Sequence, residues 1–479
     1  MEPDPRRWIA LGIVCAAFFM TVLDVSIVNV ALPSIGRSLH FSQTGLQWVI
    51  TAYAITFGGF LLLGGRAADI LGRKRMFMTG VVLFSVASLA CGLAGSTGTL
   101  VAARAIQGLG AAIVSPATLA IITTTFEEGA ERNKALGIWG AMGGSGAAAG
   151  VLFGGILTKY LGWEWIFFVN VPVGAIVLAL CVPIVRESRA PGEREGFDVV
   201  GAGSVTAGLA LLVYAISKAP VDGWSNGKTI GLLLGAAALI VFFLVWESRV
   251  RQPIMPLQIF RVRTVAGANL VGLLLGASVF SNFFLLTLYV QNVLHYSALK
   301  TGLTFLATAG TTVVVAALAQ WLTTRIGPRL VMAAGLALST GGLIWYAQIP
   351  VHGSYVRDLL PGYLLVGFGL ALSFIPVSIA ALAGVGPRDA GLASGLINTS
   401  QQIGGAIGVA IASSVAVSRA THLLRIGESQ AAALTGGYSL AFWVVAAISG
   451  AGIVVALAFI RRPEPAPEEA LAYGSPGGP

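Results

Sequence analysis

Apolar residues occur along the chain in long stretches that are separated by short polar segments. Each stretch approaches or exceeds the roughly 20 residues that a helix needs to cross the hydrocarbon core of a bilayer. The pattern therefore predicts an all-α polytopic membrane protein with fourteen membrane-spanning helices. They lie at residues 8–33, 47–65, 76–95, 98–125, 135–158, 166–185, 198–217, 229–247, 265–290, 302–322, 330–349, 359–384, 393–418 and 438–460.

The composition agrees with this pattern. Hydrophobic residues make up 56% of the 479 positions and charged residues 10%, whereas soluble domains contain roughly 25% charged residues. The three cysteines, Cys15, Cys91 and Cys181, lie in apolar stretches without metal-ligand spacing, so we expect neither a metal site nor a disulfide framework. No phosphate-binding P-loop is present, so we expect no cofactor, no enzymatic activity and no energy from bound ATP.

The basic residues predict the orientation of the chain in the membrane. Of the 29 Lys and Arg residues, twenty lie in the segments on the side of the N-terminus, eight lie in the opposite loops, and Arg104 lies inside a helix. The positive-inside rule then places both termini in the cytoplasm, as expected for a multi-pass protein of a bacterial cytoplasmic membrane. The net charge of +9 thus reflects contact with membrane lipid, and we expect no nucleic-acid partner.

One acidic residue lies deep within an apolar stretch. Asp24 is nine residues from Pro33 at the predicted end of its helix, and Arg104 is about six residues into helix 98–125 from the same side. At about 1.5 Å per residue the two share a depth to within about one turn, so they can meet if their helices are neighbours. Intramembrane acids are usually retained for work on ions or protons.

The sequence also contains an internal repeat. "GLGAAIVSP" (108–116) resembles "GFGLALSFIP" (367–376), and "DILGRKR" (69–75) resembles "TRIGPRL" (324–330). The offset predicts two six-helix halves at residues 1–186 and 261–462, with a linker and two inserted helices at 187–260 and a disordered cytoplasmic tail at 463–479. Parallel halves of this kind are typical of transporters that bind substrate at the interface.

Four motifs resemble those of the major facilitator superfamily, specifically its fourteen-helix drug:proton antiporter branch, over nearly the whole chain. They are "LDVSIVNVALP" (23–33), "GGRAADILGRKR" (64–75), "RAIQGLGAA" (104–112) and "GSGAAAGVLFGG" (144–155). The resemblance implies the major facilitator fold. It also implies Asp24 as the protonatable carboxylate, with Arg104 and Gln107 as its proton-coupling partners. The alternatives are an Asp24 that only hydrogen-bonds a neighbouring helix and an Arg104 that binds backbone carbonyls.

The second motif implies a conformational latch formed by Gly65, Asp69, Gly72 and Arg73. Both glycines would permit a tight turn, and the Asp69 carboxylate could face a helix N-terminus. A solvated basic loop that only sets topology is the alternative. In the fourth motif the usual proline is Val151, and we expect small residues to pack helices closely there. The helix-packing candidates are Gly146, Gly150, Gly154 and Gly155.

By the same resemblance, the central cavity is lined by helices 8–33, 98–125, 265–290 and 359–384. The lining candidates are Asn29, Asn269, Asn282, Phe283, Phe284, Ser373 and Phe374.

The function implied is proton-driven efflux of small amphipathic compounds, such as drugs or antibiotics, by alternating access. Its partners are protons and a small-molecule substrate, and one chain acts as a monomer. Export of an endogenous lipid or metabolite is the alternative within transport. A non-transporting receptor would need a sizeable soluble domain, and none is visible in the sequence.

Overall fold

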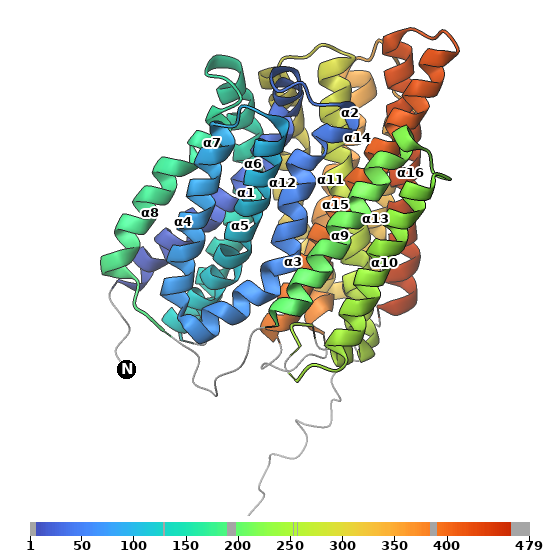
Figure 1. The fold of residues 1–479 in the computed structure, drawn as a ribbon. Helices are drawn as coiled ribbons and strands as arrows, with labels where there is room; N and C mark the ends of the chain where they lie inside the picture. Colours follow the sequence, from blue (N-terminus) through green and yellow to red (C-terminus); the bar gives the residue numbers. More distant parts are fainter. Residues whose placement is uncertain are drawn as a thin grey trace, which may run out of the picture.

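In the computed structural model the chain forms an elongated bundle of helices (Figure 1). The structure describes residues 6–127, 130–188, 198–251, 253–255, 257–383 and 390–460. The predicted tail at 463–479 and residues 189–197 of the predicted linker lie outside these ranges. We call the end of the bundle where α1 begins and α16 finishes the terminal end. The opposite end is called the loop end.

Eight helices make up the first half of the chain and two form an inserted pair. The first eight are α1 (Arg7–Ser38), α2 (Gln43–Leu46), α3 (Trp48–Leu71), α4 (Arg73–Gly92), α5 (Thr97–Thr125), α6 (Ala130–Tyr160), α7 (Trp165–Phe168) and α8 (Asn170–Ile184). The inserted pair is α9 (Val199–Asp222) and α10 (Gly227–Glu247).

The second half has six long helices and two short ones. They are the 3₁₀-helix η1 (Leu257–Arg261), α11 (Arg263–Asn292), α12 (Ala298–Ile326), α13 (Pro328–Tyr346), the π-helix η2 (Tyr355–Leu359), α14 (Leu360–Leu382), α15 (Ala390–Arg425) and α16 (Gln430–Phe459).

The predicted membrane-spanning helices are present. Among the described residues, thirteen helices are long and apolar enough to cross a membrane. The one remaining predicted span, 135–158, falls within the 31-residue α6. Several helices extend beyond their predicted bounds, among them α3, α15 and α16. Helix α1 continues past Pro33 to Ser38, because a packed membrane helix tolerates the loss of one backbone donor. The span predicted at 166–185 is divided at Val169 into α7 and α8.

Serine and asparagine caps start the helices at the loop end. The side chains of Ser42, Ser96, Asn226, Ser297 and Ser429 each accept a hydrogen bond from the first turn of the helix that follows. Such caps satisfy backbone donors that have no partner within the helix. They fix where each chain segment re-enters the bundle.

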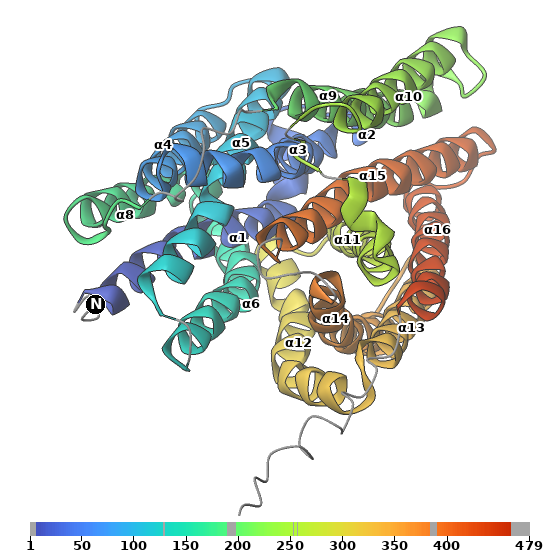
Figure 2. The same cartoon turned by 90° about the horizontal axis from the view of Figure 1, so that it is seen from below.

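The packing of helices repeats between the halves. Helix α1 packs against α6, α3 against α5 and α4 against α5, and in the second half α11 packs against α15, α12 against α14 and α13 against α14. The two loops of the sequence repeat also match, because Gly72 and Gly327 separate corresponding helices and both have positive φ values, 113° and 84°. The inserted α9 contacts α3 and α15, one from each half (Figure 2).

The two halves are in contact at the loop end. A large apolar cluster combines Ile27 to Ile35 of α1 with Phe284 to Val293 of α11, and the Gln291 amide donates to the Val30 carbonyl at 2.8 Å. Toward the terminal end, the described apolar clusters around Val14 and around Val315 each draw on one half alone. The bundle is therefore closed at its loop end.

Candidate functional site

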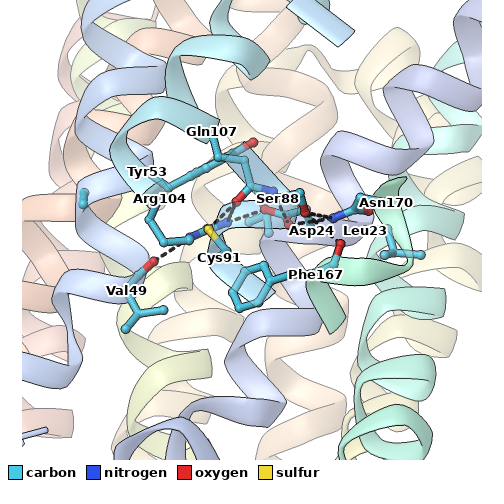
Figure 3. Close-up of polar contacts among 12 residues, drawn as sticks. Leu23, Asp24, Val49, Tyr53, Ser88, Cys91, Arg104, Gln107, Phe167 and Asn170 are labelled. Atoms are coloured by element: carbon cyan, nitrogen blue, oxygen red, sulfur yellow. Dashed lines mark hydrogen bonds and ion pairs between the residues drawn. The ribbon is translucent and has the colours of Figure 1, made fainter. Parts of the chain in front are cut away.

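Asp24 lies at the centre of a buried hydrogen-bond network (Figure 3). Its side chain is 0% exposed, and it accepts three hydrogen bonds from nitrogen donors on α5 and α8. Arg104 Nη1 lies 2.5 Å from Oδ2, while Gln107 Nε2 and Asn170 Nδ2 lie 2.8 Å and 3.0 Å from Oδ1. All three partners are donors, which suits the ionised carboxylate, because that form is an acceptor only.

Arg104 is held by further contacts besides Asp24. Its Nε donates to the Val49 carbonyl at 2.9 Å, and its Nη1 also donates to Gln107 Oε1 at 2.7 Å. The guanidinium carbon lies 4.4 Å from the Tyr53 ring centroid and 5.8 Å from that of Phe167. The sequence offered an ion pair or a structural arginine as alternatives, and the structure combines them, since Arg104 binds both a carboxylate and a carbonyl.

Asn170 was not among the residues predicted from the sequence. It begins α8 directly after the break at Val169, and its amide donates both to Asp24 and to Ser88 Oγ at 3.0 Å. Ser88 in turn donates to the Phe167 carbonyl at 2.8 Å. An asparagine in an otherwise apolar span was the available signal, but the sequence did not indicate which helix it faces.

This network links α1, α3, α4, α5, α7 and α8 around one charge pair. Breaking a buried ion pair by removing one partner costs about 3–5 kcal/mol, because the remaining charge has no compensation. Any step that neutralises Asp24 therefore changes which contacts of Arg104 and Gln107 are favourable. Chemically, the arrangement is suited to coupling the charge of one carboxyl to the relative positions of α1, α5 and α8.

The structure rearranges the predicted latch. Arg73 pairs with Asp69 through Nη2 and Oδ1 at 2.8 Å, and at the described N-terminus of α4 the capping carboxylate is not that of Asp69. That position is occupied by Glu187, whose carboxylate accepts from the backbone N–H groups of Lys74 and Arg75, both at 3.1 Å. Glu187 reaches this site because the Arg73 N–H donates to the Ser188 carbonyl at 2.9 Å.

The two latch glycines differ in their surroundings. Gly72 has a φ of 113°, and an added Cβ would lie 2.7 Å from the Glu187 carboxylate, so it needs glycine for both reasons. The prediction of a turn at Gly65 is wrong, because this residue lies inside α3. There an added Cβ would lie 3.3 Å from Pro116 of α5.

The predicted packing glycines of α6 lie against two different helices. Cβ atoms added at Gly146, Gly150 and Gly154 would meet Val22, Ser26 and Ile27 of α1. Gly155 faces the other half, where an added Cβ would lie 2.8 Å from the Leu299 Cα of α12. In the same crossing, a Cβ added at Gly302 would lie 2.5 Å from the Val151 carbonyl.

The predicted lining residues of α11 are buried to different degrees. Asn282 is 3% exposed, and its Oδ1 has no hydrogen-bond partner among the described residues. Phe283 is half-buried and its ring lies 5.1 Å from that of Phe305 in α12. Asn269 accepts from Ser400 of α15 at 2.9 Å.

The remaining lining candidates are dispersed. Phe284 lines a cavity of about 210 Å³ at the loop end, together with Arg37, Asn292 and Tyr438. The Ser373 hydroxyl points to Gly335 of α13, so α14 directs this residue toward its neighbour in the same half. Phe374 packs against the loop-end cluster, and the Asn29 amide donates within α1 to the Val25 carbonyl.

Comparisons with known proteins agree with this architecture. A profile described as the Major Facilitator Superfamily matches residues 14–409. The puromycin resistance protein pur8 of Streptomyces alboniger is 39% identical over 485 residues, which cover 100% of this chain and 96% of that protein. The cephamycin export protein CmcT of Amycolatopsis lactamdurans is 40% identical over 405 residues, which cover 84% of this chain and 83% of its own.

Solved structures share the fold at low sequence identity. The POT family transporter PepTSo aligns with a TM-score of 0.68 at 14% identity, covering 93% of this chain and 96% of that one. A bacterial homologue of the lysosomal transporter Spinster, described as inward-facing and unoccupied, aligns with a TM-score of 0.66 at 16% identity, covering 97% and 100%. Together with the profile match and the full-length relatives, the repeated helix packing shows that this chain belongs to the major facilitator superfamily of membrane transporters.

Proposed function

We propose that this protein is a proton-driven exporter of small amphipathic compounds in a bacterial cytoplasmic membrane, with both termini in the cytoplasm. The observation that carries the proposal is the fully buried Asp24–Arg104 pair inside a transporter fold. The relatives support the substrate class, because their names describe resistance to puromycin and export of cephamycin. We propose one chain as the unit of transport.

The geometry supports a simple exchange mechanism. The described bundle is closed at the loop end, which we place outside, so it corresponds to a cytoplasm-facing state with Asp24 charged. A proton that reaches Asp24 from outside neutralises the carboxylate and weakens its hold on Arg104. Arg104 keeps the Val49 carbonyl and Gln107 Oε1 as hydrogen-bond acceptors, although it loses its counter-charge. Release of the proton to the cytoplasm restores the ion pair and prepares the site for substrate.

Asp24→Asn tests this proposal. We expect substrate-induced proton release in proteoliposomes to be lost, because the amide cannot carry the proton. Unpaired Arg104 destabilises the folded protein by about 3–5 kcal/mol, so variants are compared at equal amounts of folded, monodisperse protein. The double variant Asp24→Asn/Arg104→Met removes the uncompensated charge and should recover stability without recovering coupling.

The matched control is Glu428→Gln, which removes an exposed carboxylate from the loop end and should couple normally. Proton release by Asp24→Asn at a rate near that of the wild type would show that Asp24 is not the proton carrier.

A further inference from the structure

A second pair of acidic side chains is buried at the terminal end of the inserted helices. Asp198 directly precedes α9, and Glu247 is the last residue of α10. They are 5% and 3% exposed. Both groups lie beside Gly201, where an added Cβ would be 2.3 Å from Asp198 Oδ2 and 2.9 Å from Glu247 Oε1.

Each carboxyl group uses one oxygen to accept hydrogen bonds from nearby N–H donors and leaves the other without a donor among the described residues. Asp198 Oδ1 accepts from the Gly201 N–H and from Trp246 Nε1, both at 2.8 Å. Glu247 Oε2 accepts from the Met255 N–H at 3.2 Å. Asp198 Oδ2 and Glu247 Oε1 are buried and have no donor among the described residues. Because both oxygens lie beside Gly201, two acceptors without a donor are close to each other.

Among the described residues, no basic side chain forms an ion pair with either carboxylate. The apolar cluster beside them contains Ala202, Phe243 and Ile254, with Phe60 and Leu63 of α3 packed against it. The basic side chains on the adjoining segments are Arg66, Arg249 and Arg251. None of the three forms an ion pair with Asp198 or Glu247 in the described part of the chain.

Two adjacent carboxylates in an apolar setting repel each other and lose their hydration, so both effects favour protonation of one of them. A single proton satisfies both oxygens, since one carboxyl then donates an O–H bond to the other. We propose that Asp198 and Glu247 share one bound proton between Oδ2 and Oε1, forming a second proton-binding site that is separate from Asp24.

The proposed site lies where it can affect how the two halves of the chain pack against each other. It joins the start of α9 to the end of α10 and, through the Met255 N–H, to the segment that leads into η1 and α11. Helix α9 contacts α3 of the first half and α15 of the second. Loss of the shared proton would leave two repelling charges and open this junction. The inference rests on the local geometry alone, so it stands or falls independently of proton-coupled export.

Infrared spectroscopy of the purified chain in lipid nanodiscs tests the proposal. We expect a protonated-carboxyl C=O band equivalent to about one group per chain that persists at neutral pH in the wild type. Asp198→Asn and Glu247→Gln should each abolish the band, because the amide N–H replaces the shared O–H while keeping the hydrogen bond. Asp222→Asn removes an exposed acid at the other end of α9 and should leave the band unchanged.

The pH dependence of the unfolding temperature is a second measurement. It distinguishes this pair from an unrelated protonated carboxyl group, because it compares the wild type with Glu247→Gln. The shared proton stabilises the folded chain at low pH, and this contribution is lost as the pH rises and the pair ionises. We therefore expect the wild-type unfolding temperature to fall with rising pH more steeply than that of Glu247→Gln. No band at neutral pH in the folded wild type, or a band retained in both amide variants, would overturn the proposal.

Discussion

At the residue scale, the network around Asp24 shows which contacts a sequence can and cannot reveal. Asp24 and Arg104 were predictable because charged side chains are exceptional in apolar stretches, and Gln107 because it follows Arg104 by one helical turn. Asn170 was not, because its contact with Asp24 depends on the break at Val169, which brings the start of α8 toward α1. Polar amides near the ends of spans are common, so type and position alone do not identify such a partner.

The contribution of Asn170 can be measured directly. Asn170→Leu removes a donor to the Asp24 carboxylate and one to Ser88 Oγ. Since hydrogen bonds to charged groups contribute about 1.5–3 kcal/mol, we expect the free energy of unfolding in detergent to fall by about that amount. Asn398→Leu, at an exposed position of α15, should change it by less than about 0.5 kcal/mol. Equal effects of the two substitutions would contradict the assigned role.

At the element scale, the start of α4 depends on a residue far away in the sequence. From the sequence, Asp69 was only a carboxylate that could face a helix N-terminus, whereas α4 is capped by Glu187, which follows α8. A cap that comes from another helix requires knowledge of the tertiary packing, which local spacing does not contain.

Glu187→Ala should therefore destabilise the protein. It removes a carboxylate from two backbone N–H groups at a helix N-terminus, and loss of such a cap costs about 0.5–2 kcal/mol. Denaturant unfolding in detergent measures the change. Glu428→Ala, at an exposed turn, serves as the control. The role of Glu187 would be wrong if its substitution were no more destabilising than that of Glu428.

The crossing of α6 and α12 should control closure at the loop end. Gly155→Leu places a side chain within 2.8 Å of the Leu299 Cα, which must push helices of different halves apart. We expect spin labels on Tyr160 and Lys300, both exposed, to show longer distances in the variant. Gly140→Leu on the same helix has open space at its Cβ position and should leave the distances unchanged. Unaltered distances in Gly155→Leu would exclude this crossing as a closure point.

At the scale of the whole molecule, the sequence predicted the helix count and the repeat, since both depend on periodic features of the chain. The packing pairs α1 with α6 and α11 with α15 show the repeat in three dimensions. The closed loop end was not predictable, because the same helices serve every state of a transporter. The lining candidates are dispersed for a similar reason. The depth of a residue in the membrane does not determine which face of its helix it occupies, as Ser373 of α14 shows.

The orientation of the bundle can be tested by cysteine labelling. The background lacks Cys15, Cys91 and Cys181, all of which are buried. A membrane-impermeant reagent applied to intact cells should label Ser225→Cys at the loop end but not Arg75→Cys at the terminal end. Both positions are exposed, so accessibility depends on the side of the membrane. The opposite labelling pattern would reverse the proposed topology.

The isolation of Asp24 limits the energy that one transport cycle can use. Within the described residues it is the only acid buried in the middle of a long helix, so the exchange proposed above carries one proton per cycle. A membrane potential of about 100 mV supplies about 2.3 kcal/mol for that charge. This sustains a concentration ratio of roughly 50 for an uncharged compound, since about 1.4 kcal/mol corresponds to a factor of ten. A monovalent cation exchanged for the proton moves no net charge, so its export is driven by the pH difference alone.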